Sequence, residues 1–469
     1  MSKEVTIRMY RQGLGDCFLL TFPREARPFH MLIDCGALVS RYHNAESMKK
    51  IVRNIQETTE GHIDIVAATH EHWDHISGFK VAEDVFKDIK VENVWVAWTE
   101  DPNDEAAQQL KKEFKKRKQA IEMALAKMPD DKKDQQFSLY KKAITELFGF
   151  QGGLGAKNGK SKVEQAWENL LNLGRKVYCD PKKRPLELNG VDGVRVYILG
   201  PPEEPEYIRK RLSVKETYHK SETGLPLFDS FLAAVGEDLV DSETQARAFP
   251  FDERYRIAPK DAQQKDFFRK RYGFAKGSKN EWRRIDHDWL ALAGELALHL
   301  DSYTNNVCLA MAIELVESGK VLLFPGDAQV GNWLSWGERS WKIKDSDGKT
   351  RTVTADDLLA RTVLYKVGHH GSHNATMRAR GLEKMESSEL VALIPVHRKT
   401  AEDQKWEFPY PPLWQRLKEK ARGRVLLADA KNINEIKQEA QSLLSPEEWY
   451  SFKSTTTFKD LCVEHRIKY

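Results

Sequence analysis

The segment Thr69–Gly78, with the sequence THEHWDHISG, concentrates side chains that bind metal ions. Four of them, His70, His72, Asp74 and His75, fall within six positions, directly after the apolar run IDIVAA. Side chains two positions apart on an extended segment point the same way, so His70 and His72 can reach one ion. After a sharp turn, Asp74 and His75 can face a second ion, and such ligands suit zinc, manganese or iron. The alternative is a histidine-rich surface loop, but three of the chain's 14 histidines in one hexamer favour a metal site.

Further ligand types follow two later apolar runs. Asp327 comes directly after KVLLFPG, and His369 and His370 come directly after TVLYKVG. Each run predicts a buried strand, and a side chain just past its end lies at the edge of a sheet. A lone aspartate after FPG is as often an ordinary turn residue. The shared order of strand, glycine and ligand type nevertheless predicts that these ends converge on the histidine-rich segment.

Short strand-like runs are predicted to hold these side chains. The first hundred residues contain EVTIRMY, CFLLTF, HMLID, IDIVAA and ENVWVAW, with a helical run, AESMKKIVRNIQETTEG, before the fourth of them. Helix-rich, mixed-charge sequence then dominates to about residue 300, apart from the strand-like run GVRVYILGPP. Strands return as NVCLAMAIEL, KVLLFPGD, TVLYKVGHH, LVALIPVH and RVLLAD. The pattern predicts an α/β fold with two β-rich halves and large helix-rich insertions.

These runs divide the chain into five parts. Residues 1–100 form the N-terminal half of the fold, 191–202 add a core strand, and 299–469 form the C-terminal half. Residues 101–190 are a helical insertion, and 203–298 are a second helix-rich insertion or cap. The insertions are therefore expected to decorate one fold rather than to form a separate enzyme.

Composition limits the class of protein. Of the 469 residues, 41% are hydrophobic and 31% are charged, and no run of about 18 apolar residues is present, so no transmembrane helix or membrane partner is expected. The start, MSKEVTIRMY, lacks the layout of a signal peptide. Five scattered cysteines without a CxxC pair indicate reduced thiols and a cytoplasmic protein. The net charge of +4 permits an anionic substrate without requiring one, and the oligomeric state stays open.

The motifs resemble those of the metallo-β-lactamase-fold hydrolases, whose signature HxHxDH matches HEHWDH. The closer likeness is to the soluble hydrolase domain of ComEC-like DNA-uptake proteins, on the motifs GLGDCFLL, LIDCG, VYILGPP, TNNVCLAM, FPGDA and KVGHHGS, in that order. It covers roughly the first hundred residues, a short middle piece and the stretch from about Asn305 to Asp429. It leaves most of 101–190 and 203–298 unmatched. The resemblance implies the four-layer αββα metallo-β-lactamase fold.

The resemblance also implies a two-metal site holding zinc or manganese. His70 and His72 would bind the first ion, and Asp74, His75 and the first histidine of HHGS, His369, would bind the second, with His370 as the alternative to His369. Asp327 would bridge the two ions and, with Asp74, is the catalytic choice. Asp34, in LIDCG, would support the metal loop.

One departure from the superfamily affects the first ion. Many members have a further histidine where this chain has Asn305 and Asn306, which we therefore place around the metal ligands or the substrate. His299 is close in sequence, but GELALHLDS looks helical, which favours a helix-end histidine. The first ion is therefore expected to be weakly held.

Two such cations lower the pKa of a shared water and neutralise a phosphoryl group, which suits hydrolysis of phosphodiesters. Basic residues interleave with aromatic ones at 111–118 and at 267–284, as single-stranded nucleic acid requires, and Arg269, Lys270, Arg271 and Tyr272 are the contacts expected there. The alternative for both runs is a solvated helix face. Ser372 and His373 could contact a phosphate or protonate a leaving group, or be ordinary loop residues.

The leading hypothesis is a metal-dependent nuclease acting on DNA, or on RNA, through a metal-activated hydroxide. Its insertions would gate the site or dock a regulatory protein partner. A small-molecule hydrolase acting on a signalling nucleotide, a lipid phosphodiester or a lactone is the first alternative, because the fold alone does not choose a substrate. A catalytically degenerate binding module is the second, and the intact set of ligands argues against it.

Overall fold

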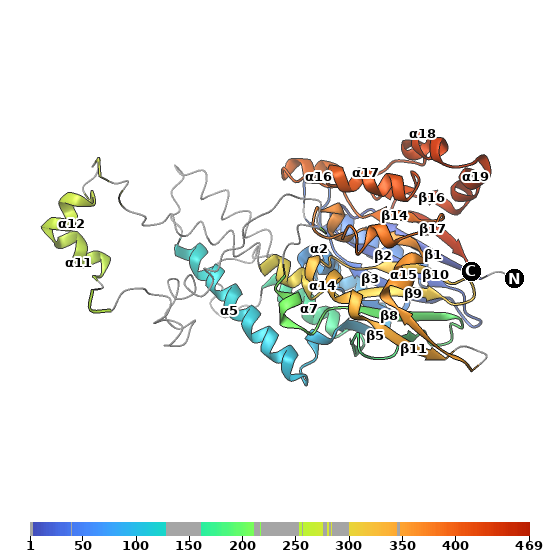
Figure 1. Ribbon diagram of the computed structural model, residues 1–469, viewed down its shortest axis with the longest axis horizontal. Helices are drawn as coiled ribbons and strands as arrows, with labels where there is room; N and C mark the ends of the chain where they lie inside the picture. Colours follow the sequence, from blue (N-terminus) through green and yellow to red (C-terminus); the bar gives the residue numbers. More distant parts are fainter. Residues whose placement is uncertain are drawn as a thin grey trace. The chain divides into compact units, whose positions relative to one another are not determined.

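Figure 1 shows the computed structural model, which describes residues 3–38, 40–127, 161–210, 216, 253–255, 257–274, 279–280, 283, 300–344 and 348–469. The chain divides into two compact units. One comprises Met1–Leu110, Asn158–Glu222 and Ser302–Tyr469, and the other comprises Lys111–Lys157 and Thr223–Asp301. Most of the second unit lies outside the described residues, so the expected boundaries of the insertions stay a prediction.

The first unit contains an eight-stranded sheet in the order β16-β17-β1-β2-β3-β4-β5-β6. Its strands are β1 (Glu4–Tyr10), β2 (Cys17–Phe22), β3 (Phe29–Cys35), β4 (His62–Ala67), β5 (Lys90–Ala97), β6 (Arg175–Cys179), β16 (Thr456–Phe458) and β17 (Cys462–Lys468). The five strands expected in the first hundred residues are confirmed. The sequence reading did not anticipate that the last strand of the chain, β17, pairs antiparallel with β1.

The second sheet has seven strands in the order β15-β14-β13-β10-β9-β8-β7. They are β7 (Leu186–Glu187), β8 (Val194–Gly200), β9 (Ala310–Leu315), β10 (Lys320–Phe324), β13 (Thr362–Lys366), β14 (Val391–Ile394) and β15 (Val425–Leu427). A separate hairpin joins β11 (Ser340–Lys344) to β12 (Thr350–Thr354). β9 starts later than the run NVCLAMAIEL suggested, because residues 300–306 are helical.

The two sheets pack face to face around one core. On β1 the apolar residues Val5, Ile7 and Met9 alternate with polar ones, so one face of the strand is buried. These side chains belong to the same core cluster as Met311 of the second sheet. The rings of Phe18 and Phe324 join the sheets edge to face, with centroids 5.6 Å apart.

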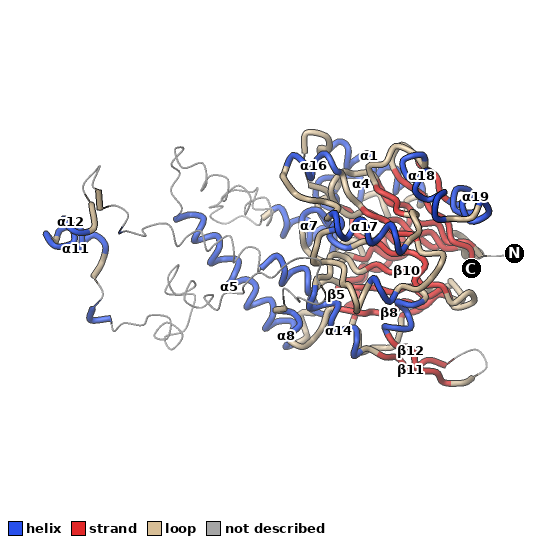
Figure 2. The backbone as a smooth tube through the Cα atoms, turned by 45° about the horizontal axis from the view of Figure 1, so that its top comes forward, coloured by secondary structure: helices blue, strands red, loops and turns tan. Residues whose placement is uncertain are grey.

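Helices cover the outer face of each sheet (Figure 2). The first sheet carries α1 (Ala45–Thr58), α2 (Trp73–Ile76), α3 (Gly78–Val81), α4 (Glu83–Phe86) and α7 (Lys162–Leu171), and the second carries α14 (Val330–Ser335), α15 (Ala355–Ala360) and α17 (Pro411–Lys420). The expected α/β class is thereby confirmed. Further α-helices in the described residues include α5 (Glu105–Lys127), α8 (Pro205–Ile208), α11 (Pro259–Gln264), α12 (Asp266–Arg271), α16 (Arg398–Asp403), α18 (Asn434–Leu443) and α19 (Pro446–Thr455).

Local sequence explains where α1 begins and ends. Asn44 caps its first turn by accepting hydrogen bonds from the backbone of Glu46 and Ser47. Beyond the last residue of α1, Thr58, Gly61 has a φ of +71° and donates its N–H to the carbonyl of Gln56. Within the described part of the chain, no helix is long and apolar enough to cross a bilayer.

Candidate metal centre

Four strand ends meet at one edge of the two sheets. β3 and β4 are parallel neighbours in the first sheet, and β10 and β13 are parallel neighbours in the second. Asp34 lies near the end of β3, the histidine-rich segment follows β4, Asp327 follows β10 and His370 follows β13. The backbone N–H of Leu309, which precedes β9, donates to the carbonyl of Thr69 at 2.8 Å and ties the two sheets together here. The predicted convergence therefore exists.

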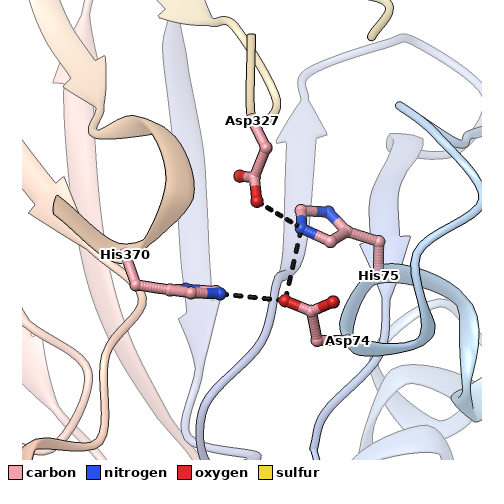
Figure 3. A group of neighbouring side chains, drawn as sticks. All are labelled: Asp74, His75, Asp327 and His370. Carbon is pink, nitrogen blue, oxygen red and sulfur yellow. Dashed lines mark hydrogen bonds and ion pairs between the residues drawn. The ribbon is translucent and has the colours of Figure 1, made fainter. Parts of the chain in front are cut away.

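The centre of the site is a group of two carboxylates and two imidazoles, Asp74, His75, Asp327 and His370 (Figure 3). One ligand atom from each lies within 4.8 Å of all the others. His75 Nε2 lies 3.1 Å from Asp327 Oδ2, and His370 Nε2 lies 2.9 Å from Asp74 Oδ2. Three of the four side chains are buried, and Asp74 is half-buried. This donor set suits a divalent transition metal.

The structure places the two histidines of HHGS differently. His370, which was the alternative, joins the group, whereas the preferred His369 does not. Both residues have a positive φ, 46° for His369 and 53° for His370, so the chain turns sharply between β13 and Ser372. The His369 side chain contacts the Ser372 hydroxyl at 3.2 Å, and only its backbone N–H reaches Asp327, at 2.8 Å.

His70 and His72 lie together beside this group. His70 Nε2 is 2.9 Å from His72 Nδ1, and the His70 and His75 rings are 4.2 Å apart. The expected alignment of two imidazoles two positions apart is therefore present. Neither belongs to a group of three or more mutually close ligand types among the described residues. The first ion of the predicted pair has two candidate ligands here, and the second has four.

Asp34 orients His75, as expected of a residue that supports the metal loop. Its carboxylate accepts hydrogen bonds from the Thr69 N–H and the Thr69 hydroxyl, both at 2.8 Å, and lies 2.8 Å from His75 Nδ1. This contact leaves His75 Nε2 free to face Asp327. Asp16, Asp34 and His75 also form a compact group, but His75 Nδ1 is already engaged by Asp34, so we do not read that group as an ion site. Asp34 has a φ of 55°, a strained value.

Lys366 and Asp16 are part of the site, and sequence reasoning assigned neither of them a role. The Lys366 side chain is buried and forms ion pairs with Asp16 and Asp327. Gly15 lets the Asp16 loop approach the metal loop, since a Cβ at Gly15 would lie 2.6 Å from the Asp74 carbonyl oxygen. Two sequence features could have identified these residues: Lys366 is the only lysine inside the apolar run TVLYKV, and Asp16 directly precedes the apolar run CFLLTF.

The histidines of the site have opposite electrostatic character. Burial lowers the pKa of His75, but Asp327 and Asp16 outweigh it and place that pKa well above its usual value. Burial also lowers the pKa of His370, but the hydrogen bond between His370 and Asp74 outweighs this effect, so the pKa of His370 is raised above its usual value. Burial lowers the pKa of His72 to about 4. The two raised imidazoles are those held by carboxylates, because a nearby negative charge favours the protonated ring.

The other expected residues lie around the site or away from it. Asn306 is fully buried and donates to the backbone carbonyls of Ile208 and Lys210, at 3.0 and 2.7 Å, so it holds two segments of the chain together. Asn305 is also fully buried, in the helical residues before β9. His299 lies outside the described residues.

Ser372 and His373 continue the turn after His370. The Ser372 hydroxyl donates to Asn374 Oδ1 at 3.1 Å, and the His373 ring lies 5.9 Å from that of Tyr410. Of the expected nucleic-acid contacts, Arg269, Lys270 and Arg271 end α12 and Tyr272 follows it. All four are exposed, and they belong to the second compact unit.

Comparison with known proteins adds no identity to this geometry. No protein-family model matches the chain, and no curated protein matches it.

Proposed function

We propose that the chain adopts the metallo-β-lactamase fold and hydrolyses phosphodiester bonds in nucleic acid, with DNA as the first choice, at a site holding zinc or manganese. Two face-to-face sheets with helices on their outer faces support the fold assignment. The positions of HEHWDH, FPGD and KVGHHGS at neighbouring strand ends support the site. The five cysteines are free and buried, which supports a reducing, cytoplasmic location.

One observation carries the proposal: carboxylates and imidazoles from both sheets converge within 4.8 Å at a buried edge. The site contains four buried or half-buried carboxylates, those of Asp16, Asp34, Asp74 and Asp327, and the buried lysine Lys366 forms ion pairs with two of them, Asp16 and Asp327. A buried negative charge is costly unless a positive charge pairs with it, so a bound cation would stabilise these carboxylates. The residues present therefore fit a divalent ion.

The chain's own residues have separable roles in this reaction. Divalent ions bound here would supply an activated water and neutralise charge on the phosphoryl oxygens. Asp74, His75, Asp327 and His370 would hold one ion, and His70 and His72 would contribute to a second, weaker one. Asp34 fixes the orientation of the His75 ring. Asp327, whose Oδ2 faces the group, is the residue placed to accept a proton from the attacking water.

Nucleic acid is the proposed substrate because exposed cations and aromatics gather outside the site. Arg269, Lys270 and Arg271 lie within one turn of Tyr272, whose ring is 5.6 Å from that of Phe268. Arginine and lysine pair with phosphates while aromatic rings stack on bases. We assign residues 203–298 the role of a cap that gates the site or docks a regulatory protein.

The proposal is tested on protein purified without chelator. Metal content is measured, and labelled single- and double-stranded DNA and RNA are incubated with manganese or zinc, in parallel with the Asp327→Ala variant. Metal-dependent cleavage that Asp327→Ala abolishes supports the proposal. Turnover of small chromogenic diesters without competition by DNA would instead indicate a small-molecule hydrolase. Protein that binds no metal and cleaves no substrate would indicate a binding module.

A further inference from the structure

Lys366 is a fixed cation inside the candidate metal centre. It ends β13, only 1% of its surface is exposed, and its ammonium group donates to the Gly326 carbonyl at 2.9 Å and to Asp327 Oδ1 at 3.1 Å. Asp16 closes the arrangement with a second ion pair to the same ammonium group. A lysine in this position does not bind a metal ion, because a protonated amine has no lone pair to offer.

The two oxygens of Asp327 consequently have different surroundings. Oδ1 accepts from Lys366 Nζ and from the backbone N–H of His369, at 3.1 and 2.8 Å. Oδ2 lies 3.1 Å from His75 Nε2 and faces the other candidate ligands. Two donors occupy the lone pairs of Oδ1, so only Oδ2 is available to an ion.

We infer that Lys366 and Asp16 form a positioning pair that limits Asp327 to one metal-binding oxygen, in which Lys366 weakens ion binding and Asp16 offsets part of that effect. This inference rests on the proposed function. A carboxylate that offers one oxygen takes one coordination position, whereas one that offers both takes two. Catalytic sites differ from structural ones in keeping a position open. Lys366 therefore lowers the affinity for the ion and, by holding one oxygen of Asp327 away from it, leaves a coordination position open to substrate.

Each member of the pair has a distinct part. Lys366 repels a divalent cation and holds Asp327 Oδ1 away from it, and both effects lower affinity. Asp16 is 1% exposed and draws the ammonium group toward itself, which offsets part of its charge. The two side chains should thus act on ion affinity with opposite signs.

The test measures the dissociation constant for Mn²⁺ alone by calorimetry, together with kcat and KM on DNA. Lys366→Met should tighten Mn²⁺ binding roughly tenfold, because a unit charge a few ångströms from the ion is removed. Its kcat should fall by about 10- to 100-fold, the usual effect of losing a residue that orients a metal ligand, with KM unchanged. Asp16→Asn should weaken Mn²⁺ binding roughly tenfold.

The double variant Asp16→Asn/Lys366→Met removes both charges and should bind Mn²⁺ within about threefold of wild type. If Lys366→Met alone does not fold, the double variant and Asp16→Asn still test the inference. Glu314→Gln is the matched control, since it breaks another buried ionic contact, 2.9 Å from Arg361, outside the site. It should lower thermal stability without changing Mn²⁺ affinity.

The outcomes separate this inference from the proposed function. If wild type binds Mn²⁺ but Lys366→Met binds it equally or more weakly, the inference is overturned and the metal site stands. If Asp16→Asn and Lys366→Met shift the affinity in the same direction, the opposed roles are wrong. Wild-type protein that binds no Mn²⁺ would overturn the metal site itself, and the inference with it.

Discussion

Glu314 and Asp327 are both buried carboxylates, each 1% exposed, and they lie at opposite ends of the antiparallel pair β9–β10. Glu314 is opposite Val321, near the start of β10, whereas Asp327 follows the far end of that strand. The two acids therefore share a sheet and a degree of burial. They differ in the groups that surround them, and that difference separates a structural acid from a candidate ligand.

Arginines surround Glu314. Its carboxylate accepts from Arg361 at 2.9 Å, from Arg351 at 3.3 Å and from the Tyr197 hydroxyl at 2.8 Å, and Arg195 lies 3.8 Å away. Guanidinium groups stay charged at all ordinary pH values and bind no metal. These contacts join β9 to β8, to the β11–β12 hairpin and to the start of β13, so Glu314 is a structural brace.

Asp327 instead lies among acids and imidazoles. Asp74, His75 and His370 come within 4.8 Å, and the lysine that pairs with Asp327, Lys366, is shared with another acid, Asp16. Imidazoles can exchange a proton for a metal ion, whereas guanidinium groups cannot. A buried carboxylate among other carboxylates and imidazoles is thus a candidate cation site, and one among arginines is a brace.

The largest expected contrast is in catalysis. Asp327→Asn should lower metal-dependent DNA cleavage by at least about a hundredfold. Replacing even a residue that only orients a metal ligand lowers activity by up to about that factor. Glu314→Gln should leave the rate per folded molecule within about threefold of wild type. Rates are measured under single-turnover conditions on protein verified as folded by circular dichroism. Equal losses in the two variants would end the distinction between brace and ligand.

Stability should show the reverse pattern. Glu314→Ala leaves three arginines without their acid and should cost about 2–4 kcal/mol of stability, somewhat less than breaking a fully buried pair because Arg351 and Arg361 reach solvent. Thermal unfolding with and without chelator provides the measurement. Chelation should destabilise Glu314→Ala as much as wild type, whereas Asp327→Ala should show no chelator effect. A chelator effect that persists in Asp327→Ala would contradict its role as a ligand.

The sequence could predict the site to the extent that local pattern specifies it. The runs before Thr69, Asp327 and His369 read as buried strands, and ligand types directly after them had to gather wherever those strands end side by side. β17 was missed because CVEHRIK mixes charged and apolar residues, and its place beside β1 depends on a pairing between the two ends of the chain.

Contacts that depend on the backbone turn or on distant partners could not be read from the sequence. His369 and His370 are chemically identical, and the positive φ of both decides which ring enters the group. The ion pair between Asp16 and Lys366 joins residues about 350 positions apart. A buried lysine in an apolar run signals that some carboxylate must pair with it, but not which one.

A smaller effect should separate the two histidines of HHGS. His370→Ala should weaken Mn²⁺ binding by about 10- to 100-fold, because it removes a ring whose Nε2 lies 2.9 Å from Asp74. His369→Ala should change the affinity by less than about threefold, since its contact with Asp327 is made by the backbone N–H. Calorimetry on the two variants gives the comparison. The opposite ranking would restore His369 as the ligand.

A last contrast concerns a buried imidazole at a distance from the carboxylates of the site. His465 on β17 lies 2.9 Å from the Thr456 hydroxyl, and burial, with the nearby charge of Arg424, lowers its pKa to about 3. Its pKa shift is opposite in direction to that of His75, which is equally buried but lies among acids. Burial alone therefore does not decide the protonation of an imidazole.

The sign of the resulting pH dependence follows from linkage. Between the ordinary histidine pKa of 6.5 and the folded value of about 3, the unfolded chain binds a proton that the folded protein excludes at His465. This contribution to stability is complete above pH 6.5 and is lost as the pH falls, by up to about 1.4 kcal/mol per pH unit. Urea unfolding of wild type and His465→Gln between pH 7 and about pH 4 measures it. The variant should lose less stability than wild type over that range, and parallel curves would show that His465 takes up its proton in the folded protein.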